Sequence, residues 1–236
     1  MVQLDKESLT YDIGDTGNSC CSSASVEHRV DMKEHWDLAY SNNHEKSLGW
    51  YESDVSPTLE LISKSAAGPS ARVLNVGAGS TTLIDTLLEH GYDNLLATDI
   101  SAVALQSLQA RIGKLSNKVE WIVDDLTNAS LLNNITPVDL WIDRAVLHFF
   151  TEEEDQKTYF RLLKNIVHKY GYVILAEFNL ESADKCSGLP VNRYNVEMLK
   201  EKLGDDFNLI TSFDFDYTMP SGDSRTYVYT LFQRVG

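Results

Sequence analysis

The stretch Arg72-Val-Leu-Asn-Val-Gly-Ala-Gly-Ser-Thr-Thr-Leu83 decides the fold, because an apolar run in it breaks into glycines and then into a helical pattern. Residues 73–76 predict a buried parallel strand, in which both faces are covered and the alternation of polar and apolar residues is lost. Gly77 and Gly79 carry no Cβ, so they allow a tight turn and a close approach of the backbone to a ligand. A strand, a glycine turn and a helix N-terminus together predict a nucleotide-type binding site.

The residues after the glycines predict a helix. Ser80, Thr81 or Thr82 can cap its start, and Gly91 ends it. Between them, apolar residues recur at helical spacing: Leu83, Ile84, Leu87 and Leu88. This helix completes the strand-turn-helix unit.

An acidic residue follows the next predicted strand. Residues 94–98 read as that strand, and Asp99 ends it about twenty residues beyond the glycines. A carboxylate there is placed to accept both hydroxyls of a ribose. The alternative is that Asp99 caps the following helix, but Ser101 suits that purpose better. We therefore expect Asp99 to bind a ribose.

The glycine pattern separates two cofactors. A dinucleotide site needs a third glycine for close helix packing, and Thr82 occupies that place. The sequence Asn-Val-Gly-Ala-Gly-Ser resembles instead the first motif of class I methyltransferases that use S-adenosyl-L-methionine (SAM). That family usually has an acid where this chain has Asn75, and an amide keeps the hydrogen-bonding capacity but loses the charge.

Composition limits the class of protein. A chain of 236 residues suits one α/β domain with a modest extension. Its 35 acidic against 20 basic residues, a net charge of -15, argue against nucleic acid as a partner and suit a neutral or cationic substrate. No apolar run approaches the roughly 18 residues of a membrane span. The polar start lacks a secretion or transit signal, so we expect a cytoplasmic protein.

The cysteines predict no metal site. Cys20, Cys21 and Cys186 lack zinc-ligand spacing and cannot all pair with one another, which suits a reducing compartment.

The chain before the first strand divides into two parts. Residues 1–25 contain few large apolar residues and predict a flexible leader, and residues 26–68 predict an N-terminal helical lid. Two readings of residues 31–52 stay open, a helix packed on the surface and a lid over cofactor and substrate. The lid reading uses the aromatic side chains of that segment: Trp36, Tyr40, Trp50 and Tyr51.

The rest of the chain predicts alternating helices and strands. The predicted helices cover residues 57–65, 152–170, where Gly171 ends the helix, and 196–203; the predicted strands cover 119–123, 138–143, 172–178, 209–217 and 225–234. Because only the turn around 220–223 joins the last two strands, they must be antiparallel. The predicted fold is therefore a Rossmann-like, doubly wound, mostly parallel seven-stranded α/β sheet with a C-terminal antiparallel hairpin. It forms a SAM-binding domain over residues 69–236, with a substrate loop at 179–192.

The chain from about residue 35 to 234 resembles a mostly bacterial group of class I SAM-dependent methyltransferases. The resemblance rests on ordered motifs, among them Asp143-Arg-Ala-Val-Leu-His-Phe149 and Lys185-Cys-Ser-Gly-Leu-Pro-Val191. It implies SAM as cofactor and S-adenosyl-L-homocysteine (SAH) as product. The cofactor-binding residues it implies are Trp36, Tyr40, Trp50, Gly77, Ala78, Gly79, Ser80, Asp99, Ile100, Asp125, Leu126 and Asp143, with Asp125 at the adenine and Asp143 near the sulfonium.

Methyl transfer is an in-line displacement, so alignment and exclusion of water supply much of the acceleration. A base is needed only for a protonated acceptor, and His148 is the candidate; the alternative is a histidine bonded to a nearby loop. The expected substrate-binding residues are Tyr51, Arg144, His148, Cys186 and Arg193.

We expect a small-molecule acceptor. The segment Trp50-Tyr-Glu52 also looks like enzymes that methylate lysines of translation factors, but those carry an Asp-Lys-Gly-Thr-Leu-Asp type motif where this chain has residues 143–148. A protein lysine is therefore the alternative acceptor. A subunit that binds SAM without turnover and a nicotinamide dehydrogenase are the remaining readings.

Overall fold

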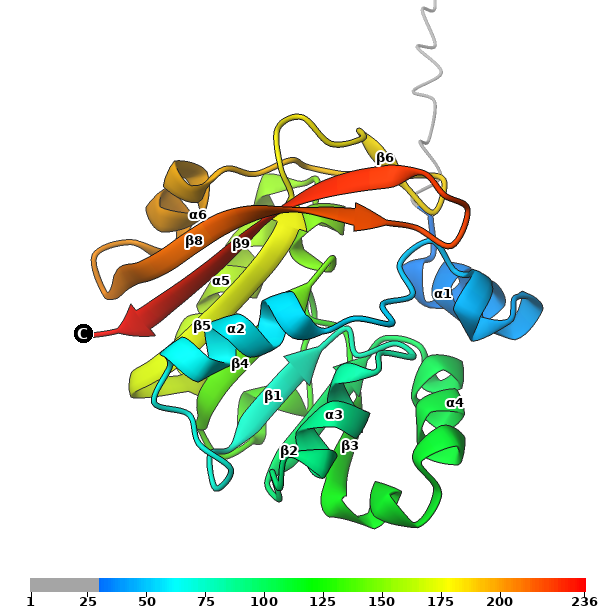
Figure 1. The fold of residues 1–236 in the computed structure, drawn as a ribbon. Helices are drawn as coiled ribbons and strands as arrows, with labels where there is room; N and C mark the ends of the chain where they lie inside the picture. The colour runs from blue at the N-terminus through cyan, green and yellow to red at the C-terminus, as the bar shows by residue number, and fades with distance from the viewer. Residues whose placement is uncertain (1–29) are drawn as a thin grey trace, which may run out of the picture. The chain divides into compact units, whose positions relative to one another are not determined.

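Seven strands form one sheet in the computed structural model, which describes residues 30–236 (Figure 1). Their order is β3-β2-β1-β4-β5-β9-β8. The first five strands run parallel to one another, and β9 is antiparallel to both β5 and β8. The strands are β1 (Val73–Val76), β2 (Leu95–Asp99), β3 (Val119–Val123), β4 (Val138–Arg144), β5 (Val167–Phe178), β8 (Phe207–Thr218) and β9 (Ser224–Arg234). This confirms the predicted fold class.

Helices cover both faces of this sheet. The α-helices are α1 (Met32–Asn42), α2 (Ser56–Lys64), α3 (Leu83–Glu89), α4 (Ala102–Ile112), α5 (Glu153–Ile166) and α6 (Val196–Leu203). Short 3₁₀ helices are η1 (Glu45–Ser47), η2 (Gly113–Lys118), η3 (Leu132–Asn134) and η4 (Leu147–Phe149). In Figure 1, α2 and α3 lie in front of the sheet and α5 lies behind it.

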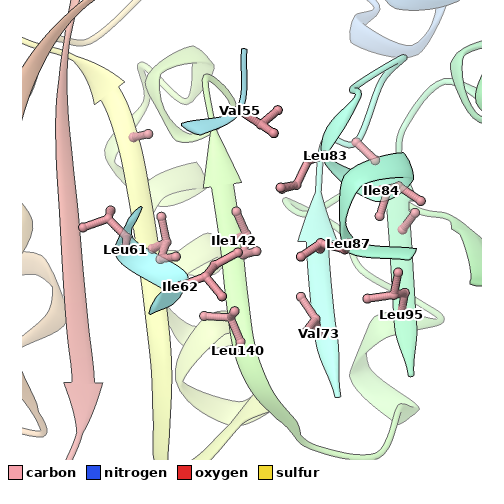
Figure 2. Packing of buried hydrophobic residues seen from close by; sticks show 14 of the residues in the cluster. Val55, Leu61, Ile62, Val73, Leu83, Ile84, Leu87, Leu95, Leu140 and Ile142 are labelled. Atoms are coloured by element: carbon pink, nitrogen blue, oxygen red, sulfur yellow. The ribbon is translucent and has the colours of Figure 1, made fainter. Parts of the chain in front are cut away.

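Two apolar layers hold these helices to the sheet. In the first, shown in Figure 2, Leu61 of α2 and Ile84 of α3 are fully buried against β1, β2 and β4. In the second, Tyr159 of α5 and Leu199 of α6 pack on the opposite face around Trp141. Burying a large apolar side chain contributes roughly 1.5–3 kcal/mol. The turn between β1 and α3 is therefore fixed by packed elements on both sides.

One predicted boundary was wrong. We expected the helix at 152–170 to end at Gly171, but α5 ends at Ile166 and β5 already begins at Val167. The β-branched Val167 pairs with Val138 of β4, and the backbone then bulges at Tyr170, whose φ is 70°. Gly171 is needed because a Cβ there would lie 2.9 Å from the carbonyl oxygen of His168. Gly171 therefore fits a crowded position within β5 and does not end a helix.

The chain divides after Val30 into two units, and residues 31–236 hold the whole sheet. The predicted leader, residues 1–25, lies outside the described residues, as do Cys20 and Cys21. Within the predicted helical lid, the apolar core takes up Leu61 and Ile62 of α2 together with the flanking Val55 and Ala67. The predicted substrate loop, 179–192, contains a small antiparallel hairpin of β6 (Lys185–Cys186) and β7 (Leu189–Pro190). Within residues 30–236 we find no helix long and apolar enough to cross a membrane.

Candidate active site

The glycine turn, residues 77–81, lies at the carboxyl edge of the parallel strands. Gly77 and Gly79 have φ values of 55° and 51°, which side chains rarely adopt. A Cβ on Gly77 would overlap with the side chain of Val146, and one on Gly79 would overlap with the Tyr40 hydroxyl. The glycines therefore admit two of the protein's own side chains, whereas the sequence had indicated only the approach of a ligand.

Asp99 lies beside this turn at the end of β2. Its Oδ2 accepts a hydrogen bond from the backbone N–H of Gly79 at 2.8 Å, and its Oδ1 accepts one from Ser101 at 2.8 Å. Burial raises the carboxyl pKa to about 6 although these bonds oppose the rise. Each carboxylate oxygen keeps a second lone pair, so the group can still accept hydroxyl donors. Ser101 itself caps α4, as predicted.

The neighbouring residues of β1 and of the turn also suit a polar ligand. The Asn75 side chain is buried, and its amide makes none of the hydrogen bonds found among residues 30–236. Ala78 and Ser80 are buried in the turn, and Ile100 follows Asp99 partly exposed. A cavity of about 370 Å³ adjoins Ser80 and Tyr40. The Asn75 amide and the Asp99 carboxylate, which keeps free lone pairs, can form hydrogen bonds to the cofactor that the sequence predicts.

Aromatic side chains of the predicted lid, residues 31–52, gather at the turn. The Trp50 Nε1–H donates to the Tyr40 hydroxyl at 2.9 Å, and the Trp36 ring meets the Trp50 ring edge-on at 5.2 Å. Trp36 also contacts Phe149 of η4 at 5.0 Å. Tyr51 participates through its backbone carbonyl, which accepts a hydrogen bond from the Tyr217 hydroxyl. Three of the four predicted lid aromatics, Trp36, Tyr40 and Trp50, thus form one group beside Gly79.

The predicted adenine residues follow β3. Asp125 Oδ1 accepts hydrogen bonds from both the backbone N–H and the hydroxyl of Thr127, at 2.8 and 2.7 Å. Leu126 is buried in the core on the α5 side. This arrangement is a hydrogen-bonded turn, and contact of Asp125 with an adenine stays a prediction.

Arg144 at the end of β4 is held in a buried polar group that the sequence did not reveal. Its Nε lies 3.0 Å from Glu52 Oε1, and its Nη1 donates to the Trp50 carbonyl at 3.2 Å. Its guanidinium lies between the rings of Tyr217 and Tyr227, at 4.9 and 4.7 Å from their centroids. The Nη2 atom is buried and has no hydrogen-bond partner within residues 30–236. Glu52 ends the segment Trp50-Tyr-Glu52, but nothing in the sequence linked it to Arg144.

Two fully buried acids meet on the opposite face. Asp143 on β4 and Glu177 on β5 lie close enough for their charges to repel, and Tyr159 donates to Asp143 Oδ2 at 2.6 Å. Two neighbouring carboxyls cannot both ionise easily, which favours the protonated form of one of them. Burial is the main cause that raises both pKa values, that of Asp143 to about 6 and that of Glu177 well above its usual range. Glu177 was not predicted; its only sequence signal is a charge inside an apolar strand.

His148 is buried beside this acid pair. Its Nδ1 lies 3.2 Å from Glu177 Oε2, but the geometry is not that of a hydrogen bond, and neither ring nitrogen has a partner within residues 30–236. Burial, together with the nearby Arg144 charge, lowers its pKa to about 3. The imidazole is therefore neutral at physiological pH. Its catalytic role stays a prediction.

The hairpin β6–β7 connects the substrate loop to the lid. The Ser187 hydroxyl lies 3.2 Å from His35 Nε2 of α1. Burial raises the pKa of the neighbouring Cys186 thiol to about 11, so the thiol stays protonated and is a poor nucleophile. Arg193 Nη1 donates to the carbonyls of Leu180 and Ser182, and thereby braces the loop. Among residues 30–236, no three His, Cys, Asp or Glu side chains are arranged to hold a metal ion.

Comparison with known proteins agrees with this geometry. Residues 73–171 match a family described as a methyltransferase domain. The chain is 23% identical over 185 residues to EEF1A lysine methyltransferase 2 of Danio rerio, covering 72% of this chain and 78% of the relative. It is 24% identical over 127 residues to an eEF1A lysine and N-terminal methyltransferase of Bos taurus, covering 53% of this chain but only 17% of the relative.

Solved structures share the fold. A SAM-dependent methyltransferase from Anabaena variabilis has a TM-score of 0.69 at 13% identity, covering 86% of this chain and 93% of that one. The N-methyltransferase NodS from Bradyrhizobium japonicum, solved with SAH, has a TM-score of 0.62 at 13% identity, covering 85% and 98%. Together with the domain match, these findings confirm the predicted enzyme class and cofactor. The narrower group that carries the 143–149 and 185–191 motifs stays a prediction.

Proposed function

We propose that this SAM-dependent methyltransferase transfers a methyl group to a small molecule that the lid and the two hairpins enclose. The observation that carries the proposal is the closure around Arg144. The lid contacts β8 through Tyr51 and Tyr217, β4 through Trp50 and Arg144, and β6–β7 through His35 and Ser187. An acceptor held inside these contacts must be small. A protein substrate would have to reach in from outside, past the lid.

The residues present fit the cofactor. Asn75, the glycine turn and Asp99 would hold its amino acid and ribose parts, and Asp125 and Leu126 its adenine. SAM supplies the methyl group as an electrophile on a positively charged sulfur. The lid aromatics Trp36, Tyr40 and Trp50 would exclude water and present ring faces that favour a cation.

The protein's part in the chemistry is then alignment and proton handling. Arg144 Nη2 offers an unused donor that can orient a carbonyl or carboxylate of the acceptor. His148 would take a proton if the acceptor arrived protonated. Its low pKa, caused by burial and by the Arg144 charge, opposes this step. We therefore propose His148 as a base only for such acceptors.

A second acceptor class has its own support. The relative from Danio rerio, by its name a lysine methyltransferase of EEF1A, aligns over most of both chains. The surplus of 35 acidic over 20 basic residues also suits a basic protein. In this alternative, the lid must open to admit a lysine side chain.

One experiment separates the two classes. The purified protein is incubated with methyl-labelled SAM and either the small-molecule filtrate or the protein fraction of one extract, with purified eEF1A as a further arm. We expect label in the filtrate. The Asp99→Ala variant serves as the control for cofactor-dependent transfer. Label in eEF1A or in the protein fraction alone would establish the lysine alternative, and no transfer in any arm, with SAM bound, would indicate a non-catalytic SAM-binding subunit.

A further inference from the structure

A single arginine joins four parts of the site that are far apart in the sequence. Arg111 lies in the last turn of α4, and 22% of its side chain is exposed. Its Nε and Nη2 donate to the two carboxylate oxygens of Asp85 in α3, at 3.2 and 2.8 Å. Nη1 donates to the Ser80 carbonyl at 2.8 Å, and Nη2 donates also to the Thr81 carbonyl. The remaining Nη1 hydrogen reaches Glu45 Oε2 at 2.8 Å.

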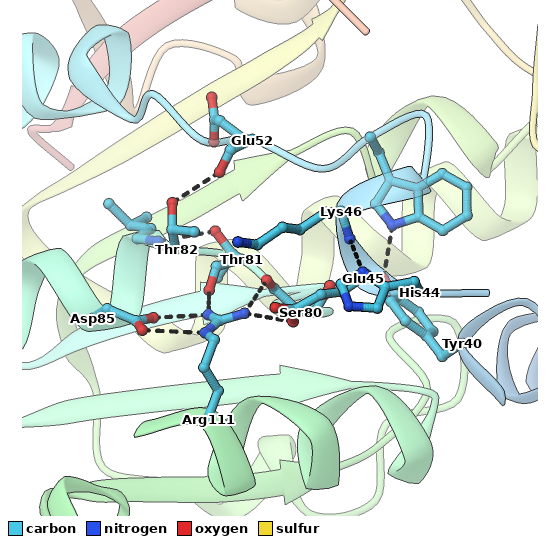
Figure 3. Close-up of polar contacts among 12 residues, drawn as sticks. Tyr40, His44, Glu45, Lys46, Glu52, Ser80, Thr81, Thr82, Asp85 and Arg111 are labelled. Atoms are coloured by element: carbon cyan, nitrogen blue, oxygen red, sulfur yellow. Dashed lines mark hydrogen bonds and ion pairs between the residues drawn. The ribbon is translucent and has the colours of Figure 1, made fainter. Parts of the chain in front are cut away.

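These five hydrogen bonds use every N–H that a guanidinium possesses. Lysine could not replace it, because an ammonium has three donors and no planar fork. Figure 3 shows the guanidinium between Asp85 on one side and Ser80 and Glu45 on the other. Arg111 therefore fixes the end of the glycine turn through the carbonyls of residues 80 and 81.

Glu45 is the one partner that belongs to the lid. It begins η1, midway between Tyr40 and Trp50, whose side chains are hydrogen-bonded to each other beside Gly79. The cavity of about 370 Å³ is bounded by Tyr40 and Glu45 of the lid, by Ser80 of the turn, and by Ser107 and Arg111 of α4. The Glu45 carboxylate thus ties the centre of the aromatic segment to the same arginine that holds the turn.

We propose that Arg111 is a positioning residue that couples the lid to the glycine turn through its ion pair with Glu45. The proposal rests on the proposed function, since the lid matters for transfer only if the turn binds SAM. Asp85 anchors the guanidinium to helix α3, which packs on the sheet, so the pair with Glu45 closes the lid onto a fixed point. Opening the lid must break this pair, and the retention of bound cofactor depends on it.

The test compares variants on the two sides of Arg111. Glu45→Gln removes the lid charge but keeps a polar side chain, and Arg111→Lys removes the fork. Lys33→Gln is the matched control, because it breaks an ion pair of the same lid, with Asp37, that stays within α1. It leaves the Asp37 bond to Ser101 in place. Amide hydrogen exchange is followed in the free proteins, and SAH dissociation is followed by the fluorescence of Trp36 and Trp50.

We expect Glu45→Gln to speed amide exchange in residues 40–50 and to speed SAH dissociation about threefold to fivefold, the upper range for partly exposed ion pairs. Amide exchange in residues 77–83 should change only in the Arg111→Lys variant, because Arg111 holds the carbonyls of residues 80 and 81. Lys33→Gln should match the wild type in both measurements. If Glu45→Gln behaved like Lys33→Gln, the coupling would be refuted. If the wild type bound neither SAM nor SAH, the proposed function would fail, while the exchange comparison would still decide the coupling.

Discussion

At the scale of single residues, the candidate site depends on acids whose charge the fold controls. Asp99, Asp143 and Glu177 are all buried, yet each is held differently. Asp99 accepts two backbone N–H groups, whereas the Glu177 carboxyl lies beside that of Asp143, whose charge raises its pKa. The same carboxyl group thus differs in charge from place to place, because its neighbours decide how easily it ionises.

The proposed ribose role of Asp99 gives the first prediction. Asp99→Ala should weaken SAH binding by about 1.5–3 kcal/mol, because two charge-assisted hydrogen bonds to hydroxyls are lost. Titration calorimetry measures the loss, and the melting temperature checks that the variant folds. Unchanged affinity in a folded variant would mean that the ribose lies elsewhere.

The raised pKa of Asp99 predicts how binding depends on pH. Its folded value of about 6 exceeds the ordinary 3.8, so protonation stabilises the free fold at low pH, and that stability is lost as the pH rises through 6. Hydroxyl donors need the ionised form, so the SAH dissociation constant should rise about tenfold per pH unit below 6.

Calorimetry from pH 5 to pH 8 tests this dependence, with Asp99→Ala as the control. Two nearby acids bear on the result. Asp37 faces Asp99, but its pKa is lowered, so it stays ionised. Asp143 has a pKa of about 6 as well, and its contribution persists in the control. An identical pH dependence in both proteins would rule out Asp99 as the titrating group.

At the scale of elements, the sequence predicted structure where local pattern and tertiary packing agree. The apolar run at β1 and the glycines after it identified the turn, and the short 220–223 connection identified the β8–β9 hairpin. The end of α5 was predicted wrongly, because helical spacing continues past Ile166 while pairing with β4 determines the strand. The Arg111, Arg144 and Asp143 networks join distant segments, so no local pattern could reveal them.

The glycine turn yields a prediction at this scale. Gly77 and Gly91 both have positive φ, 55° and 83°, but only at Gly77 would a Cβ meet another side chain, that of Val146. Gly91→Ala should cost about 1–2 kcal/mol of unfolding free energy from backbone strain alone. Gly77→Ala should cost about 1–3 kcal/mol more from overpacking.

Urea denaturation of both variants measures this difference. The double variant Gly77→Ala with Val146→Ala should recover part of the unfolding free energy that Gly77→Ala loses to overpacking, because it removes the overlapping methyl groups of Val146. Equal stability of Gly77→Ala and Gly91→Ala would show that Val146 moves aside freely, and that the turn does not depend on this contact.

At the scale of the whole molecule, the lid segment is joined to the sheet at separate points with separate purposes. Glu52 neutralises the buried Arg144, and its backbone carbonyl accepts from Thr82 at 2.8 Å. Trp36, Tyr40 and Glu45 lie upstream and contact the turn region. Cutting the chain between these two sets of contacts should therefore separate cofactor binding from folding.

Three truncations test the separation. A chain that starts at residue 26 should bind SAH like the full chain. A chain that starts at residue 48 keeps Trp50, Glu52 and α2, so it should fold, but it should bind SAH at least about tenfold more weakly, because Trp36, Tyr40 and Glu45 are gone. A chain that starts at residue 53 also loses Glu52, which leaves the buried Arg144 without its carboxylate partner. This loss should lower the free energy of unfolding by about 3–5 kcal/mol more. Calorimetry with SAH and urea denaturation measure the two effects, and full-strength binding by the chain from residue 48 would show that the aromatic segment is surface packing and no lid.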